Sequence, residues 1–209
     1  YFCEIITSIY ISDNLPTMWR KIMDDLVSWK NNPDRKPLVI RGVRQCGKTT
    51  ILKRFGEERY RDCVYVNLEK QPAFCAVFEK DHDVQRIVSD ISALSRTKIE
   101  KEDTLLILDE IQSCPRALAS LKYFQEDGKG YHVACAGSLL GIVLARSSSK
   151  PVGKTEDLTM YPMDFHEWMI ANGEDLLWEA VSENPGTLDA ALADRLERLY
   201  REYLFVGGM

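Results

Sequence analysis

The residues from Gly42 to Thr49 read G-V-R-Q-C-G-K-T and match the pattern G-x-x-x-x-G-K-T. This pattern is typical of a loop whose backbone N–H groups wrap the phosphates of a nucleotide, because glycine lets the backbone approach closely and adopt positive φ angles. The Lys48 ammonium would reach the β- and γ-phosphates, and the Thr49 hydroxyl would hold Mg²⁺. The predicted nucleotide-binding residues are Gly42, Val43, Arg44, Gln45, Cys46, Gly47, Lys48, Thr49 and Thr50.

A second pattern with chemical potential is the apolar run Leu105–Leu108, which is followed by Asp109 and Glu110. The run predicts a buried strand, and the two acids would emerge at its carboxyl end, where open α/β sheets bind ligands. Asp109 would hold Mg²⁺ together with Thr49, and Glu110 would orient and deprotonate a water molecule. The alternative is a strand that ends in a solvated turn. The combination of this acidic pair with the glycine loop favours hydrolysis over binding alone.

The neighbouring segments are of the kind that would position these residues. The apolar run Leu38–Ile40 precedes the loop, and the helix-forming stretch Thr50–Phe55 follows it, so the helix N-terminus would face the phosphates. Strands are predicted over residues 38–40, 63–67, 104–108, 131–136 and 158–161, and helices over 16–30, 84–94, 115–124 and from 187 onward. This alternation predicts an α/β fold with a parallel sheet and right-handed crossovers.

The character of the chain changes near Tyr161. Asp164 is a candidate N-cap with Glu167 as its capping-box partner, and helical spacing of apolar residues continues to the end. We therefore expect a phosphate-loop core over residues 1–161 and a small helical, lid-like region over 162–209.

Composition limits the classes of function. The chain has 209 residues, is 45% hydrophobic and 28% charged, and carries a net charge of −5, which gives no support for a nucleic-acid surface. The longest apolar run, Val133–Ala145, is too short to cross a bilayer, and the N-terminus has no signal-peptide pattern. The cysteines contain no C-x-x-C pair and are expected to be reduced, with neither a disulfide framework nor a zinc site, so we predict a cytoplasmic protein. They are Cys3, Cys46, Cys63, Cys75, Cys114 and Cys135.

Five motifs together resemble a large prokaryotic family of AAA-type ATP-binding proteins that carry a C-terminal domain of unknown function. The motifs are Gly42–Thr50, Leu108–Gln112, Ala136–Gly141, Pro151–Lys154 and Tyr161–Trp168. The resemblance implies ATP and Mg²⁺ as ligands and a five-stranded sheet in the order 5-1-4-3-2. It also implies that Ser138 is a sensor of the γ-phosphate and that Asn67 holds Glu110 until activation, although a strand-end Asn is equally typical of a turn.

The chain departs from this family in ways that affect the expected rate. Many members have Gly-Arg where this chain has Gly153-Lys154, and Arg146 and Arg116 are the other candidates for a charge supplied to the γ-phosphate by a neighbouring copy. Poor placement of such an arginine would make hydrolysis slow. Cys46 is either a small filler residue or a redox-sensitive thiol. The last residues resemble the start of the family's C-terminal region, which we expect to be absent here.

Three functions follow from these patterns. The first is a Mg²⁺-dependent ATPase coupled to a partner or to an absent C-terminal domain, and the second is a slow nucleotide-dependent switch. The third is a small-molecule kinase, which is disfavoured because no lid of clustered arginines is present. A homo-oligomer, and a protein or nucleic-acid partner acting through the missing region, are open; a membrane partner is not expected.

Overall fold

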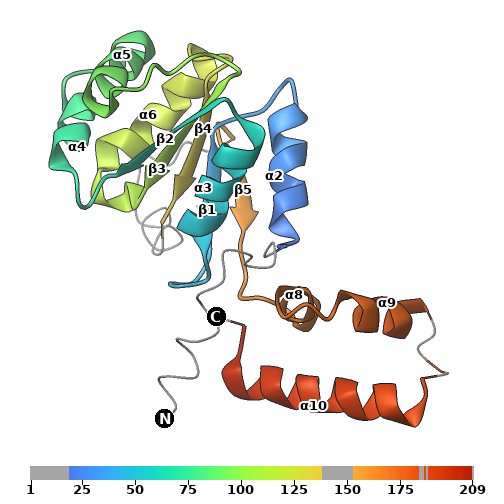
Figure 1. The fold of residues 1–209 in the computed structure, drawn as a ribbon. Coiled ribbons are helices and arrows are strands. Elements are labelled where there is room, and N and C mark those ends of the chain that lie inside the picture. The colour runs from blue at the N-terminus through green and yellow to red at the C-terminus, as the bar shows by residue number, and fades with distance from the viewer. Residues whose placement is uncertain (1–18, 138–152, 184–185, 187, 209) are drawn as a thin grey trace. The chain divides into compact units, whose positions relative to one another are not determined.

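The computed structural model describes residues 19–137, 153–183, 186 and 188–208 (Figure 1). The chain divides into two compact units. The larger unit comprises Ile22–Tyr161, and the smaller unit combines Tyr1–Lys21 with Pro162–Met209. Within the described residues, no helix has both the length and the apolar character needed to cross a membrane.

The larger unit is built on one five-stranded sheet in the order β2-β3-β4-β1-β5, in which every pair of neighbouring strands is parallel. This is the predicted order 5-1-4-3-2 viewed from the other edge, so the predicted fold class is confirmed. β3 and β4 are buried along their whole length, and for β3 the apolar run Leu105–Leu108 predicts this burial. The strands are β1 (Leu38–Arg41), β2 (Asp62–Asn67), β3 (Thr104–Asp109), β4 (His132–Ala136) and β5 (Glu156–Thr159).

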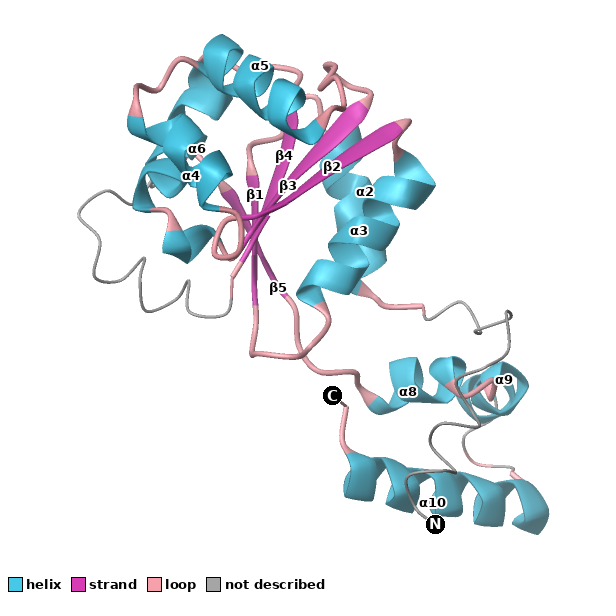
Figure 2. Cartoon of the chain, turned by 60° about the vertical axis from the view of Figure 1, so that its left-hand side comes forward, coloured by secondary structure: helices cyan, strands magenta, loops and turns pink. Residues whose placement is uncertain are grey.

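Helices cover both faces of the sheet, which separates the core into two layers (Figure 2). Successive side chains of a strand point to opposite faces, so Leu106 and Leu108 pack in one layer and Leu105 and Ile107 in the other. One face is covered by α2 (Ile22–Asn31) and α3 (Lys48–Arg59), and the other by α4 (Pro72–Glu79), α5 (Val84–Ser95) and α6 (Pro115–Glu126). The short 3₁₀ helix η1 (Ile111–Ser113) links β3 to α6.

The register of the sheet brings several strand ends level with one another. Asn67 at the end of β2 pairs with Asp109 at the end of β3, and Asp109 pairs in turn with Ala136 of β4. Ala136 pairs with Ile40 of β1, two residues before Gly42. Because all these strands run in the same direction, the segments that follow them meet at one edge of the sheet.

The smaller unit contains α8 (Phe165–Ala171), α9 (Asp175–Glu183) and α10 (Ala190–Val206). These helices pack around a core of Trp168, Met169, Leu177 and Leu199. The predicted capping box at the start of α8 is confirmed: Asp164 Oδ1 accepts from Glu167 N at 2.9 Å, and Glu167 Oε2 accepts from Asp164 N at 3.1 Å.

Glu167 also ties the segment before α2 to this unit. Its Oε1 accepts from the Lys21 backbone N at 2.8 Å and lies 3.1 Å from Arg20 Nε. The side chains of Arg20 and Glu167 are both buried. The predicted core began at residue 1, whereas the structure groups Arg20 and Lys21 with the C-terminal helices.

Several element boundaries differ from the sequence-based expectations. Asp83 is the N-cap of α5, as one of the two predicted candidates. β5 spans Glu156–Thr159, so it begins and ends before the predicted 158–161, and it pairs with β1 along that whole length. α4 was not predicted, since its sequence is apolar almost throughout and shows no helical spacing of polar residues.

The expectation that all cysteines are reduced thiols is wrong for two of them. Cys75 of α4 and Cys114, which precedes α6, form a disulfide with a Cα–Cα distance of 5.9 Å. The two residues are 39 positions apart, so their spacing carries no signal, and only the packing of α4 against α6 brings them together. The carboxylate of Glu79 lies within 4.8 Å of both sulfur atoms.

Candidate functional site

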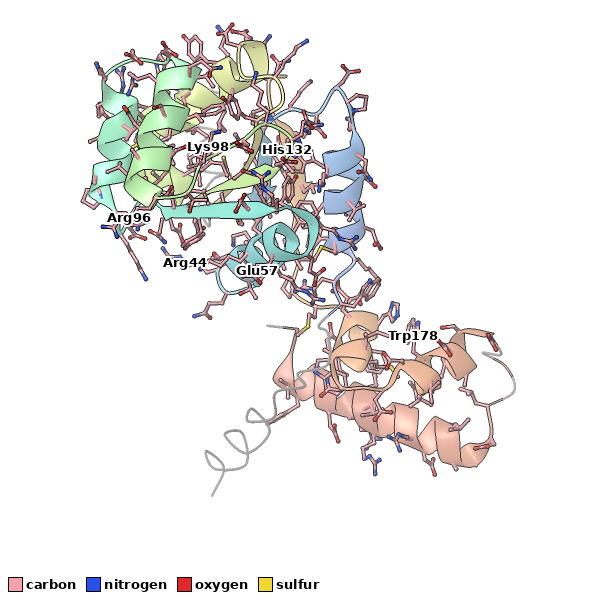
Figure 3. All side chains as sticks on the ribbon, turned by 45° about the horizontal axis from the view of Figure 1, so that its top comes forward. Arg44, Glu57, Arg96, Lys98, His132 and Trp178 are labelled. Carbon is pink, nitrogen blue, oxygen red and sulfur yellow. A yellow bond between two sulfur atoms is a disulfide. The ribbon has the colours of Figure 1, made fainter. Side chains whose placement is uncertain are left out.

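The predicted phosphate loop connects β1 to α3. Gln45 has φ 65° and Gly47 has φ 93°, so the chain makes two left-handed steps before α3 begins at Lys48. A turn of this kind directs successive backbone N–H groups into a concave surface that binds anions. The N-terminus of α3 adds the positive end of the helix dipole at the same point. Arg44 of the loop is exposed (Figure 3).

Close packing explains the requirement for glycine at position 42. A Cβ atom at Gly42 would lie 2.2 Å from the backbone oxygen of Met160, the residue that follows β5. Cys46 is buried at 3% exposure, and its Sγ donates to the same oxygen at 3.7 Å. The loop is therefore packed against the end of β5, and Cys46 occupies the place of a small filler residue.

Lys48 points into the loop. Its Nζ donates to the backbone oxygens of Gly42 at 3.0 Å and Val43 at 2.6 Å, and the residue is only 8% exposed. A buried ammonium needs acceptors, and here the loop's own carbonyls provide them. These carbonyls are neutral acceptors, so an anionic phosphate entering the loop would compete for the same ammonium.

The acid of β3 lies against the first turn of α3. Thr49 Oγ1 donates to Asp109 Oδ2 at 2.9 Å, and Asp109 is 4% exposed. Asp109 Oδ1 accepts from Glu110 N at 3.1 Å. A hydroxyl and a carboxylate oxygen that converge in this way fit Mg²⁺, which prefers oxygen ligands. The structure thus brings together the two residues that were predicted to bind the metal.

Tyr65 of β2 is a member of the site that sequence analysis missed. Its hydroxyl donates to Asp109 Oδ2 at 2.8 Å, the oxygen that also receives Thr49. Burial raises the pKa of the Tyr65 phenol. The hydrogen bond from Asn67 lowers this pKa, and the hydrogen bond to Asp109 raises it, so the pKa stays above its usual value. The phenol is therefore a protonated donor at neutral pH. The available signal was its position two residues before Asn67, which puts both side chains on one face of the strand.

Glu110 has an unusual backbone conformation, with φ 50° and ψ 44°. A residue other than glycine in this region costs roughly 1–3 kcal/mol, and such outliers gather at functional sites. The amide of Gln112 donates to Glu110 Oε2. Gln112 is thus a second member that sequence reasoning did not assign, because its contact depends on the turn made by η1.

Within the described part of the chain, the hydrogen bonds of the Asn67 side chain are made with groups other than Glu110. Asn67 Oδ1 accepts from the backbone N of Glu69 at 3.1 Å and of Lys70 at 2.9 Å, which caps the turn into α4. Asn67 Nδ2 donates to the Tyr65 hydroxyl at 3.4 Å. The side chain therefore serves the turn and faces Tyr65 at the same time.

The remaining predicted residues lie elsewhere. Ser138 and Arg146 are outside the described residues. Lys154 precedes β5, so it lies at the amino ends of the strands, opposite the phosphate loop, and its Nζ is 3.0 Å from Glu126 of α6. Arg116 donates from Nε to the backbone oxygen of Phe78 at 3.0 Å.

Comparison with known proteins places this architecture in a family. The profile described as the AAA domain matches residues 34–169, more than half of the chain. This chain belongs to the AAA domain family. Its phosphate loop and parallel sheet are accordingly those of an AAA-type P-loop ATPase domain. A comparison with curated protein sequences found no match.

Solved structures with a similar fold include a Walker-type ATPase of Pyrococcus abyssi, which is 15% identical with a TM-score of 0.54. The match covers 90% of this chain and 63% of that one. The Drosophila ORC bound to DNA is 14% identical with a TM-score of 0.51, and the match covers 95% of this chain and 54% of that one. Cdc6p of Pyrobaculum aerophilum is 17% identical with a TM-score of 0.50, with 78% and 52% covered. This AAA domain therefore spans only part of the length of these proteins.

Proposed function

We propose that this AAA domain binds ATP with Mg²⁺ at the phosphate loop and hydrolyses it, and that hydrolysis is coupled to a partner that is still to be identified. The observation that supports the proposal is the 2.9 Å contact between Thr49 Oγ1 and Asp109 Oδ2. It joins the loop hydroxyl and the strand acid, which are the two oxygen donors that a nucleotide-bound metal requires.

Lys48 and the loop backbone would bind the phosphates. The ammonium exchanges the carbonyl oxygens of Gly42 and Val43 for the more strongly charged oxygens of the β- and γ-phosphates. Thr49 and Asp109 would hold Mg²⁺. When bound, the metal neutralises charge on the phosphate oxygens and so stabilises the transition state.

Glu110 would orient the attacking water and accept its proton, because it follows the metal-binding acid directly and its backbone is held in a strained turn. Its carboxylate is bound by the Gln112 amide, so Glu110 must release Gln112 before it can act on water. Ser138 is proposed as a sensor of the γ-phosphate from its place after β4.

The Gln112 contact also supports a second candidate function. If Glu110 stays bound to Gln112 while ATP is present, the protein would hydrolyse ATP slowly and act as a nucleotide-dependent switch. A positive charge from a neighbouring copy would then be needed for rapid hydrolysis. Such a homo-oligomer and a protein or nucleic-acid partner are part of the proposal. The cytoplasmic setting was predicted from reduced cysteines, and the Cys75–Cys114 disulfide contradicts that basis.

The test is to measure nucleotide binding and Mg²⁺-dependent phosphate release by the full chain over a range of protein concentrations. We expect Lys48→Ala to abolish ATP binding. Glu110→Gln is expected to retain binding and lose hydrolysis, because it keeps the shape of the side chain but removes the base. A rate that rises more steeply than protein concentration would indicate assembly. Equal ATP affinity of Lys48→Ala and the unmodified protein would refute the site assignment.

A further inference from the structure

The metal-binding carboxylate proposed above is held by two hydroxyl groups. Thr49 Oγ1 and Tyr65 OH both donate to Asp109 Oδ2, at 2.9 Å and 2.8 Å. Thr49 belongs to the phosphate loop and would itself bind the metal, whereas Tyr65 lies on the neighbouring strand β2. Tyr65 therefore contacts Asp109, the proposed metal ligand, from the side of β2.

The Tyr65 ring is itself held from two directions. Lys53 Nζ of α3 lies 3.7 Å from the ring centroid, a distance typical of a cation–π interaction. The backbone of Tyr65 is fixed by pairing of β2 with β3, opposite Ile107. The phenol therefore has a defined orientation, and its hydroxyl can direct one donor at Asp109.

Asn67 completes a chain of polar contacts. Its Nδ2 donates to the Tyr65 hydroxyl at 3.4 Å, and the same hydroxyl donates onward to Asp109. Asn67 Oδ1 is occupied by the backbone N–H groups of Glu69 and Lys70, so the orientation of the amide is set by the turn into α4. This assigns Nδ2 to the Tyr65 side.

We propose that Tyr65 is a positioning residue for the metal-binding carboxylate of Asp109, and that Asn67 acts on the metal site through Tyr65. This inference depends on the proposed binding of Mg²⁺ and nucleotide at the same site. A carboxylate with one free torsion samples several orientations, and a fixed donor on Oδ2 selects one of them. Groups that orient a metal ligand typically change metal affinity or activity by roughly 10–100-fold when removed.

The proposal gives Asn67 a route to the site that differs from direct contact with Glu110. In that direct arrangement, the effect of changing Asn67 would be independent of Tyr65. In the arrangement proposed here, removing the Tyr65 hydroxyl interrupts the route, so a change at Asn67 has no further effect on metal binding. The two residues are in contact, and a double-mutant cycle separates these cases.

The first experiment uses Tyr65→Phe, which removes the hydroxyl and keeps the ring that packs against Lys53. Binding of a fluorescent ATP analogue is measured across a range of Mg²⁺ concentrations and again in excess EDTA. We expect the Mg²⁺ concentration at half-maximal binding to rise about 10–100-fold. Affinity in EDTA is expected to stay unchanged, because the phosphate loop is intact.

The matched control is Tyr131→Phe. Tyr131 also donates from its hydroxyl, to Gln85 Oε1 at 3.1 Å, but it lies before β4, at the amino ends of the strands. The Tyr131→Phe variant should leave the Mg²⁺ dependence of nucleotide binding unchanged. An unchanged Mg²⁺ midpoint in Tyr65→Phe would overturn the proposal, as would an equal loss of affinity with and without Mg²⁺, which would indicate general damage to the site.

The second experiment adds Asn67→Ser, alone and with Tyr65→Phe. Serine keeps a side-chain oxygen for the turn into α4 but is too short to contact Tyr65. We expect the single variant to raise the Mg²⁺ midpoint and the double variant to match Tyr65→Phe. Additive effects would overturn the role assigned to Asn67. Failure of the unmodified protein to bind nucleotide would instead refute the proposed function, and the two failures are thus distinguishable.

Discussion

Thr49 and Asp109 are 60 positions apart in the chain, yet Thr49 Oγ1 lies 2.9 Å from Asp109 Oδ2. Thr49 lies in the first turn of α3 and Asp109 ends β3, and both lie at the same edge of the sheet. The contact is possible because β1 and β3 are parallel strands separated only by β4. It makes the phosphate loop and the acidic strand end one site, and it is the relationship on which the proposed function depends.

Gly42→Ala tests the close packing of the loop. The added Cβ would lie 2.2 Å from Met160 O, which is backbone and cannot move aside without shifting the end of β5. We expect the free energy of unfolding to fall by about 1–3 kcal/mol, measured by urea denaturation, together with loss of ATP binding.

Gly153→Ala is the matched control for this prediction. Gly153 has φ +74° but open space around its Cβ position. The variant should therefore lose only about 1–2 kcal/mol of unfolding free energy, which is what left-handed backbone strain costs. It precedes β5 and should keep ATP binding. Normal ATP affinity in Gly42→Ala would show that the loop tolerates displacement.

Reduction of the Cys75–Cys114 disulfide should destabilise the larger unit. The bond closes a loop between residues 39 positions apart, and opening it gives the unfolded chain more freedom, which we expect to lower the free energy of unfolding by about 2–4 kcal/mol. Urea denaturation of the oxidised protein with and without dithiothreitol measures the difference. Cys75→Ala should unfold like the reduced protein and be insensitive to dithiothreitol. Identical curves for oxidised and reduced protein would contradict the prediction.

Acidification should destabilise the larger unit through His132, which lies among buried aromatic rings at the start of β4 (Figure 3). Its Nδ1 is 2.6 Å from Tyr60 OH and its Nε2 is 2.9 Å from Glu102 Oε2. Burial lowers the pKa of His132, and the opposing effect of Glu102 does not cancel this. The unfolded chain therefore binds the proton first as pH falls, so stability is full above about pH 6.5 and is lost below it.

The measurement is urea denaturation in steps between pH 7.5 and pH 5, with His132→Gln as the comparison. The variant should be less stable at pH 7.5 and show a flatter dependence on pH in this window. Surface carboxylates such as Glu100, whose pKa is lowered to about 2 by hydrogen bonds from Lys98 and Arg61, would act only below about pH 4.5. Parallel curves for the two proteins would exclude His132 as the source.

Glu167→Ala should unfold the smaller unit. The Glu167 carboxylate accepts from the backbone N of Lys21 and of Asp164, and it neutralises the buried Arg20 guanidinium. Removing one partner of a buried ion pair typically costs about 3–5 kcal/mol. Hydrogen exchange of the α8 amides would report the loss. Glu179→Ala, at an exposed position of α9, is the control and should leave exchange unchanged. Equal protection in both variants would show that Arg20 finds another partner.

The family resemblance supplied the strand order. The sequence by itself predicted the alternation of strands and helices, the phosphate loop and the two acids after β3, and these features are predictable because they are local. A glycine pattern, a continuous apolar strand or a capping box such as Asp164 with Glu167 requires residue types at fixed short spacing, and the spacing alone identifies the backbone conformation.

Only the tertiary structure decided which side chains meet across strands and helices. The Tyr65 contact with Asp109 depends on the register of β2 and β3, the Gly42 contact with Met160 on where β5 ends, and the Cys75–Cys114 bond on how α4 packs against α6. Each of these pairs is distant in sequence. Their approach depends on sheet register and helix packing, which arise from the whole core, so local residue spacing carries no record of them.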